Sequence, residues 1–172
     1  MIETARLFAR YNAHVNTEMN KVLSTLAAED WTKDRGGHFS SFQSMAGHIY
    51  TADVHWMVRF TGLRPFQAVK GDPFDFPPSW DKPPFGAVAE YAGLRRTLDQ
   101  AIEAFTQELT EADMKAPLAY RNSRGDAFTK NFGGLVFHMF NHQTHHRGMV
   151  ALYLDQMGVK NDFSNLNAIV ES

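Results

Sequence analysis

A histidine-rich segment near the end of the chain carries the residue type that binds transition metals. His138, His142 and His146 follow one another at four-residue intervals, and His145 lies beside the last of them. On a helix, residues four positions apart lie on neighbouring turns of one face, so two imidazoles can chelate one ion. At about 100° per residue, His142 and His146 fall within the apolar stripe of this segment and His138 lies near its edge. The pattern predicts a metal site on a buried face; the alternative is two core histidines with ordinary hydrogen-bond partners.

A third metal ligand has to come from another helix. His48 and His55 are seven residues apart, which is nearly two turns and about 10 Å along a helix. Only one of them can therefore reach an ion held by the later pair. The position of His48 on the apolar side of its helix favours His48, and His55 stays open as the alternative. The two remaining histidines, His14 and His38, are expected at the surface.

Three neutral imidazoles would hold one divalent ion per chain and leave coordination positions open for water or a substrate. All-nitrogen donors suit zinc and nickel, and also iron, cobalt and copper. The chain has no cysteine, which excludes a thiolate metal site, a disulfide framework and a cysteine nucleophile. Because ordinary histidines titrate near pH 6.5, metal release is expected between about pH 6 and 4.

Other polar residues near the histidines have more ambiguous roles. Asp53 follows His48 by five residues and projects about 140° away from it on a helix, so a structural role is expected. Arg147 is expected either in a salt bridge between helices or as a clamp for a substrate anion. Metal-bound histidines usually donate their second N–H to a partner. The candidates for that partner are Asn141, Gln143 and Asp162.

Length and composition indicate one globular unit. The chain has 172 residues, 44% of them hydrophobic, and a formal net charge of −2. This predicts a single domain over residues 1–172 with a real core. The absence of a basic surplus argues against nucleic acid or an anionic membrane as partner. Since no signal-like or membrane-spanning apolar run is found, a cytoplasmic protein is expected.

Apolar residues at three- and four-residue steps predict four long helices. A hairpin is expected over residues 116–130, because the turn-forming run from Asn122 to Asp126 separates two apolar stretches. Ser40 and Gln43 have the spacing of a capping box, and Gly158 is a natural helix terminator. The sequence therefore predicts an all-α four-helix bundle. The expected helices span residues 4–28, 40–61, 87–109 and 131–157.

A long connection joins the second and third of these helices. Residues 62–86 contain six of the seven prolines, which makes a regular element there unfavourable. Five aromatic residues are interleaved with the prolines, so a solvated linker is equally unexpected. The connection is predicted either to pack as a crossover loop or to form a lid over a pocket. The aromatic residues are Phe66, Phe74, Phe76, Trp80 and Phe85.

These motifs resemble those of the DinB/YfiT-like metal-dependent four-helix-bundle proteins, which are unrelated to the DNA polymerase that shares the name DinB. The resemblance begins at Tyr11-Asn12 and continues through a serine-led helix over residues 41–62. It ends in the string NHQTHHRG from Asn141 to Gly148, its most specific mark. Met149 departs from the family, which often has glutamine at that position.

The resemblance implies a ligand set of His48, His142 and His146, and so selects His48 over His55. It also implies an enzyme acting on a small molecule, either a transferase that uses a low-molecular-weight thiol or a hydrolase. The alternative is a non-catalytic metal- or ligand-binding protein of a stress response. A homodimer is the oligomeric state that the resemblance implies.

Overall fold

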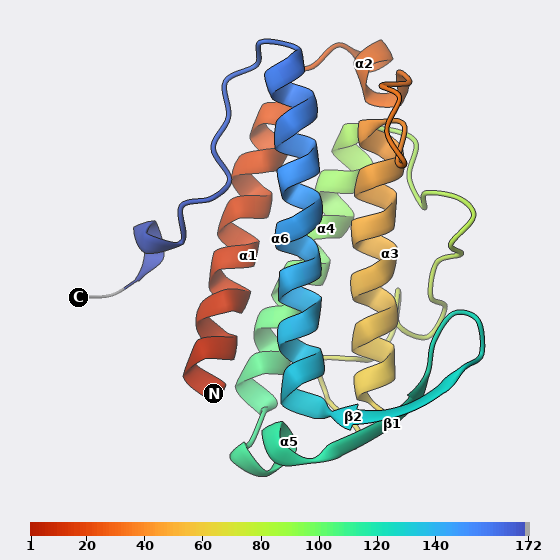
Figure 1. Cartoon of the computed structure of the whole chain (residues 1–172), viewed down its shortest axis with the longest axis vertical. Helices are drawn as coiled ribbons and strands as arrows, with labels where there is room; N and C mark the ends of the chain where they lie inside the picture. The colour runs from red at the N-terminus through yellow and green to blue at the C-terminus, as the bar shows by residue number, and fades with distance from the viewer. Residues whose placement is uncertain (171–172) are drawn as a thin grey trace.

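The computed structural model describes residues 1–170, and within them four long helices pack side by side as a bundle (Figure 1). The predicted all-α bundle is confirmed, and the small hairpin precedes the last long helix as expected. The long helices are α1 (Ile2–Leu23), α3 (Phe42–Phe60), α4 (Val88–Glu108) and α6 (Phe132–Gln156). The smaller elements are α2 (Ala28–Thr32), α5 (Glu111–Lys115), β1 (Pro117–Arg121), β2 (Ala127–Asn131) and the 3₁₀ turn η1 (Leu166–Ile169).

The direction of the helices decides the path of the long connection. α1 and α6 run upward in Figure 1, whereas α3 and α4 both run downward. The connection from the end of α3 to the start of α4 must therefore return along the whole length of the bundle. α1 packs mainly against α4, and α3 packs against α6.

Each long helix buries one face in a shared apolar core, which is why the three- and four-residue spacing predicted them. On α3, Met45, Ile49 and Met57 are fully buried. The first helix ends at Leu23, whereas the sequence predicts an end near residue 28. The short α2 lies between this helix and α3. No helix among residues 1–170 is both long enough and apolar enough to cross a membrane.

The start of α3 differs from the prediction by one residue. The capping box is formed by Ser41 and Ser44, each of whose backbone N–H donates to the other's hydroxyl at 3.1 Å. The predicted capping pair Ser40 and Gln43 is therefore wrong. The N-cap is Ser41, and the helix begins at Phe42, whose side chain is buried in the core. Gln43 instead donates to the carbonyls of Phe85 and Gly86, at the end of the long connection.

The long connection contributes to the core at both ends. Phe66, Phe74 and Phe85 are buried, whereas Phe76 is 83% exposed and Trp80 is 43% exposed. Three of the five aromatic residues therefore complete the core, as the packed-loop interpretation predicted. At the other end of the chain, Gly158 terminates α6 with a φ of 71°, as predicted.

Candidate metal centre

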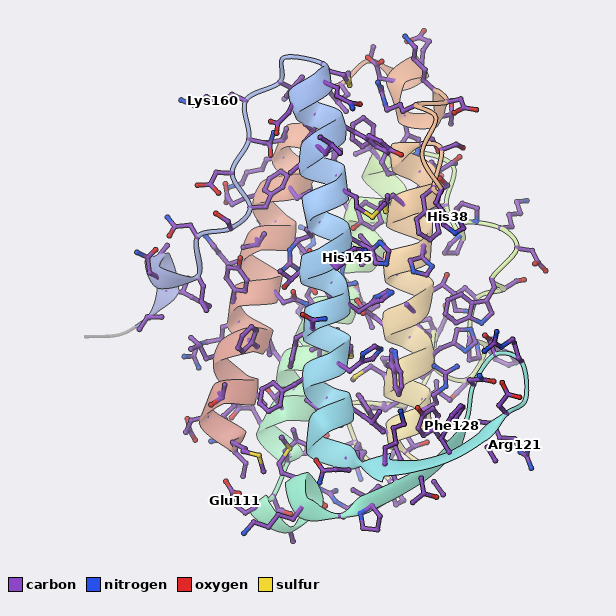
Figure 2. All side chains as sticks on the ribbon, viewed as in Figure 1. His38, Glu111, Arg121, Phe128, His145 and Lys160 are labelled. Atoms are coloured by element: carbon purple, nitrogen blue, oxygen red, sulfur yellow. The ribbon has the colours of Figure 1, made fainter. Side chains whose placement is uncertain are left out.

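The structure brings three histidines from two helices together. His48 lies two turns into α3, and His142 and His146 lie midway along the neighbouring α6. The Nε2 atom of His142 is 3.0 Å from Nε2 of His48 and 3.1 Å from Nε2 of His146. Figure 2 shows nitrogen-bearing side chains gathered between α3 and α6 near the labelled His145. Ligand atoms of the three residues lie within 4.8 Å of one another, close enough to hold one metal ion.

The separations of these nitrogen atoms fit the coordination sphere of a transition metal. Nitrogen ligands lie about 2.0–2.1 Å from zinc, so two of them at 90–110° are about 2.8–3.4 Å apart. The two measured Nε2 separations are 3.0 and 3.1 Å. At the same time, the Nδ1 atoms of His142 and His146 are buried without a hydrogen-bond partner in residues 1–170. The three Nε2 atoms therefore converge at a spacing that one metal ion could bridge.

Burial keeps the three imidazoles in the neutral form that metals require. It lowers the pKa of His142 to about 3, and the neighbouring charges of His146 and His48 act in the same direction. Burial lowers the pKa of His146 to about 4, with a further contribution from His48. The pKa of His48 is lowered by burial as well. Protons compete less well with metal at such sites. Release of a bound metal ion is therefore expected at a lower pH than the sequence alone indicates.

A phenylalanine that the sequence did not single out covers the histidine cluster. The Phe39 ring stacks on His48 at 4.3 Å between centroids and meets His146 edge-on at 5.4 Å. The loop that carries Phe39 is fixed by Tyr153, whose hydroxyl donates to the Phe39 carbonyl at 2.7 Å. Gly37 permits this approach, because a Cβ atom there would overlap the Tyr153 hydroxyl. No local periodicity marks such a loop residue, so only the tertiary structure places it.

The middle of the long connection covers the cluster from the other side. Trp80 lies 6.0 Å from the ring of His48 and stacks on His55 at 4.8 Å. The Nε2 atom of His55 is 3.0 Å from the Pro78 carbonyl oxygen, so His55 faces the connection rather than the histidine pair. The lid interpretation therefore applies to Trp80 alone among the five aromatic residues.

A small cavity of about 140 Å³ separates the connection from the cluster. His48, Phe39 and Trp80 line it, together with Asp81 and Thr51. No pattern in the sequence marks the carboxylate of Asp81, because this residue lies in the irregular, proline-rich connection. The cavity provides space for a small molecule next to His48.

The other histidines lie outside the cluster. His14, His38 and His145 are exposed, which confirms the surface expectation for the first two. His138 is also exposed, and its ring lies 6.3 Å from that of His142.

The partners predicted for the imidazole N–H groups are wrong. Asn141 and Asp162 are exposed, and Asp162 accepts hydrogen bonds from Ser164. Gln143 is buried, but its side chain points toward α1, where it accepts from Asn16 at 3.3 Å. A residue next to a ligand on a helix is rotated by about 100°, which explains why it cannot reach the same site.

Arg147 and Asp53 belong to the core of the bundle. Arg147 is 1% exposed and donates to the Asn12 side chain, with its guanidinium over the Tyr11 ring at 5.4 Å. It is therefore neither the predicted salt bridge nor a substrate clamp. Asp53 accepts from Arg95 at 2.5 Å and is completely buried, in keeping with the structural role expected of it.

A four-helix bundle with an imidazole cluster between its second and fourth long helices defines a class of helical protein with a candidate metal centre. The sequence model of the DinB family matches residues 1–168, and the chain belongs to that family. It is 23% identical over 149 residues to Protein DinB of Bacillus subtilis (strain 168), covering 86% of this chain and 83% of that protein.

The crystal structure of a DinB-like protein from Bacillus cereus ATCC 10987 has the same fold. It superposes with a TM-score of 0.59 at 22% sequence identity, covering 89% of this chain and 92% of that chain.

Proposed function

We propose that the protein holds one divalent transition-metal ion through His48, His142 and His146 and uses it in a reaction of a small molecule. The observation that carries this proposal is the convergence of three Nε2 atoms, with neighbouring separations of 3.0 and 3.1 Å. Zinc and nickel suit this donor set best, and iron, cobalt and copper also fit nitrogen ligands. Such an ion supplies Lewis-acid chemistry, lowering the pKa of a bound water or thiol and polarising a carbonyl.

The residues around the cluster support a reaction rather than metal storage. A site that held its ion by protein ligands on all sides would be closed, whereas His48 here borders a cavity of about 140 Å³. Phe39 and Trp80 wall that cavity with aromatic rings and so limit the access of water. Asp81 is the carboxylate on its wall and is the residue we expect to hold or move a proton.

We propose that the reaction is thiol-dependent group transfer, with hydrolysis as the second candidate. The chain has no cysteine, so a thiol nucleophile has to come from a separate low-molecular-weight molecule. The small cavity beside His48 has room for the thiol end of such a molecule.

The first test is the metal content of protein purified without added metal, measured by mass spectrometry. We expect close to one divalent ion per chain. Cobalt-substituted protein is then titrated with 2-mercaptoethanol and, as a control, with ethylene glycol. A sulfur-to-cobalt charge-transfer band with the thiol alone supports thiol chemistry. A full metal content without that band would contradict the thiol branch, and metal-free wild-type protein would overturn the proposal.

We also propose that the protein is a homodimer formed by packing helices of two copies side by side. Light scattering at micromolar concentration should then give about twice the chain mass of 19.5 kDa. A species of single-chain mass under those conditions would contradict the dimer.

A further inference from the structure

A second cavity lies one helical turn from the histidine cluster and has no role in the function proposed above. Its volume is about 400 Å³, which is within the range of pockets that bind small molecules. It lies where the β1–β2 hairpin meets α3 and the start of α6. Figure 2 shows Phe128 and Arg121 on this hairpin, where it curves past the lower end of α3. The lining residues are Trp56, Tyr120, Lys130, Asn131, Gly134, Leu135 and His138.

The register of the hairpin explains why a lysine reaches this cavity. Leu118 pairs with Lys130, and Tyr120 pairs with Phe128, in the antiparallel ladder. Side chains two residues apart on a strand share a face, so these four residues lie on the same side of the hairpin. Leu118 is buried against the bundle, which identifies that side as the inner one. Lys130 is therefore a cation on the inner face of the hairpin, at the mouth of the cavity.

The walls of the cavity combine aromatic surface with positive charge. Trp56 packs on Tyr120 at 5.4 Å between centroids and on His138 at 5.2 Å. The Arg59 guanidinium lies 4.9 Å from the Trp56 ring on its outer side. The lining residues include one lysine and no carboxylate, although the chain as a whole carries a net charge of −2. This local excess of positive charge favours an anionic ligand with a flat or apolar body.

His138 lies between this cavity and the histidine cluster. It lines the cavity, and its ring is 6.3 Å from that of His142. One turn of α6, about 6 Å, separates the two residues along the helix axis. A molecule whose reacting group lies at the cluster would therefore have to span about one helical turn, past His138, to reach the cavity.

We propose that this cavity binds the acidic, flat or apolar end of the small-molecule substrate, with Lys130 pairing its carboxylate and Trp56 contacting its body. The proposal rests on the proposed function in one respect, namely that the other end of the molecule reacts at the histidine cluster. Lys130 and Trp56 are thus residues that determine specificity, since neither contacts the cluster.

The test uses 2-naphthoate and its uncharged analogue 2-naphthamide as probes, because neither contains a thiol. Dissociation constants are measured by calorimetry on metal-loaded wild-type protein. We expect naphthoate to bind about five- to tenfold more tightly than naphthamide, as suits one partly solvated ion pair. Lys130→Gln should bring the two constants within twofold of each other. Arg124→Gln, which removes a cation at the turn of the same hairpin outside the cavity, should leave the preference intact.

A second pair of variants tests the cavity itself. A Cβ atom added at Gly134 would be in ordinary contact with Asn131 Oδ1, at 3.5 Å, and Gly134 lines the cavity, so Gly134→Met should place its side chain in the cavity. We expect it to weaken binding of both probes at least tenfold. Gly93→Met, at an open position on α4, is the matched control and should change neither constant.

Three results would overturn the proposal. They are equal constants for the two probes, a preference that survives Lys130→Gln, and unaltered binding to the Gly134→Met variant. A preference that survives Lys130→Gln but disappears in His142→Ala would instead place the carboxylate at the histidines. Failure of the metal proposal is distinguishable, because wild-type protein would then lack metal while the Lys130-dependent preference remained.

Discussion

Two clusters of polar side chains lie within the same helical bundle, and they differ in how their members are paired. One is the set of three histidines between α3 and α6. The other, which we call the ion network, crosses from α1 through α4 to α3 and is centred on Arg95. Both interrupt an apolar core, where unpaired polar groups are unfavourable.

In the ion network, one buried cation lies between two carboxyl groups. The Arg95 guanidinium lies 2.5 Å from an Asp53 carboxylate oxygen and 2.7 Å from one of Asp99. Asn16 donates to both oxygens of Asp99, at 3.0 and 3.1 Å. Arg95 and Asp53 have no exposed side-chain surface. Such a network holds helices together and leaves no place for a ligand.

The histidine cluster has the opposite character. Its three members are alike, they present the same atom to one another, and one of them, His48, lines a cavity. These imidazoles are neutral, and the buried Nδ1 atoms of His142 and His146 have no hydrogen-bond partner among residues 1–170. Within the described part of the chain, no charged side chain completes this cluster as Arg95 completes the ion network, which makes it the better candidate for a ligand site.

The largest effect expected is loss of metal on removing any member of the histidine cluster. His48→Ala, His142→Ala and His146→Ala should each remove most of the bound ion, because two imidazoles chelate far more weakly than three. Metal content by mass spectrometry provides the measurement. As surface controls, His14→Ala and His38→Ala should keep the wild-type content. Stoichiometric metal in His142→Ala would show that the ligands are different residues.

A large loss of folding stability is expected when the ion network is broken. Arg95→Ala would leave two buried carboxylates without their cation, which should lower the free energy of unfolding by about 3–5 kcal/mol. Urea denaturation provides the measurement, with Arg96→Ala on the adjacent exposed position as a control within about 0.5 kcal/mol of wild type. In metal-free protein, His142→Ala should change stability much less than Arg95→Ala. An equal loss in the two variants would remove the distinction between the clusters.

The long connection shows the same division between structural and ligand-facing residues on a smaller scale. Phe74 is buried in the core, so Phe74→Ala should lower the free energy of unfolding by about 3 kcal/mol. Trp80 is 43% exposed and lies beside His48. Trp80→Ala should therefore leave stability within about 1 kcal/mol of wild type but weaken 2-mercaptoethanol binding to the cobalt protein severalfold. A Trp80→Ala variant with unchanged thiol affinity would contradict the role of a lid.

The smallest effect expected concerns how the stability of metal-free protein depends on pH. The two clusters should contribute to this dependence in opposite directions. The pKa of His142 is lowered to about 3 in the folded chain, whereas the unfolded chain keeps the ordinary value of about 6.5. Below about pH 6.5 the unfolded chain gains a proton that the folded chain does not, so stability is lost on acidification. Burial raises the pKa of Asp53 to about 7 although Arg95 opposes the shift. Its contribution to stability is therefore lost as the pH rises from about 4 to 7.

Urea denaturation at pH 7.5 and pH 5 separates these contributions. Relative to wild type, His142→Ala should lose less stability on acidification, because the histidine with the lowered pKa is absent. Asp53→Asn should lose more, because the carboxyl that gains a proton in the folded state is absent. If both variants lost more stability than wild type on acidification, or both lost less, the assigned pKa shifts would be contradicted.

Features that depend on neighbours along the chain could be predicted from the amino-acid sequence. Apolar periodicity defined the four long helices, the run from Asn122 to Asp126 defined the hairpin turn, and Gly158 defined the end of α6. The spacing of His142 and His146 placed two imidazoles on one helix face, because residues four apart share a face whatever the helix packs against. Metal binding by these residues stays a prediction.

Which distant residues share a site depends on how the helices and loops pack, and the sequence pattern did not reveal it. The helical wheel left His48 and His55 open, and the packing of α3 on α6 brings His48 to the pair while His55 faces Pro78. Phe39 and Asp81 lie in irregular segments, whose paths are fixed by contacts far along the chain and leave no periodic pattern. The rotation of each helix about its axis is likewise set by the whole core. That rotation turns Gln143 away from the histidines, although it adjoins one of them in the sequence.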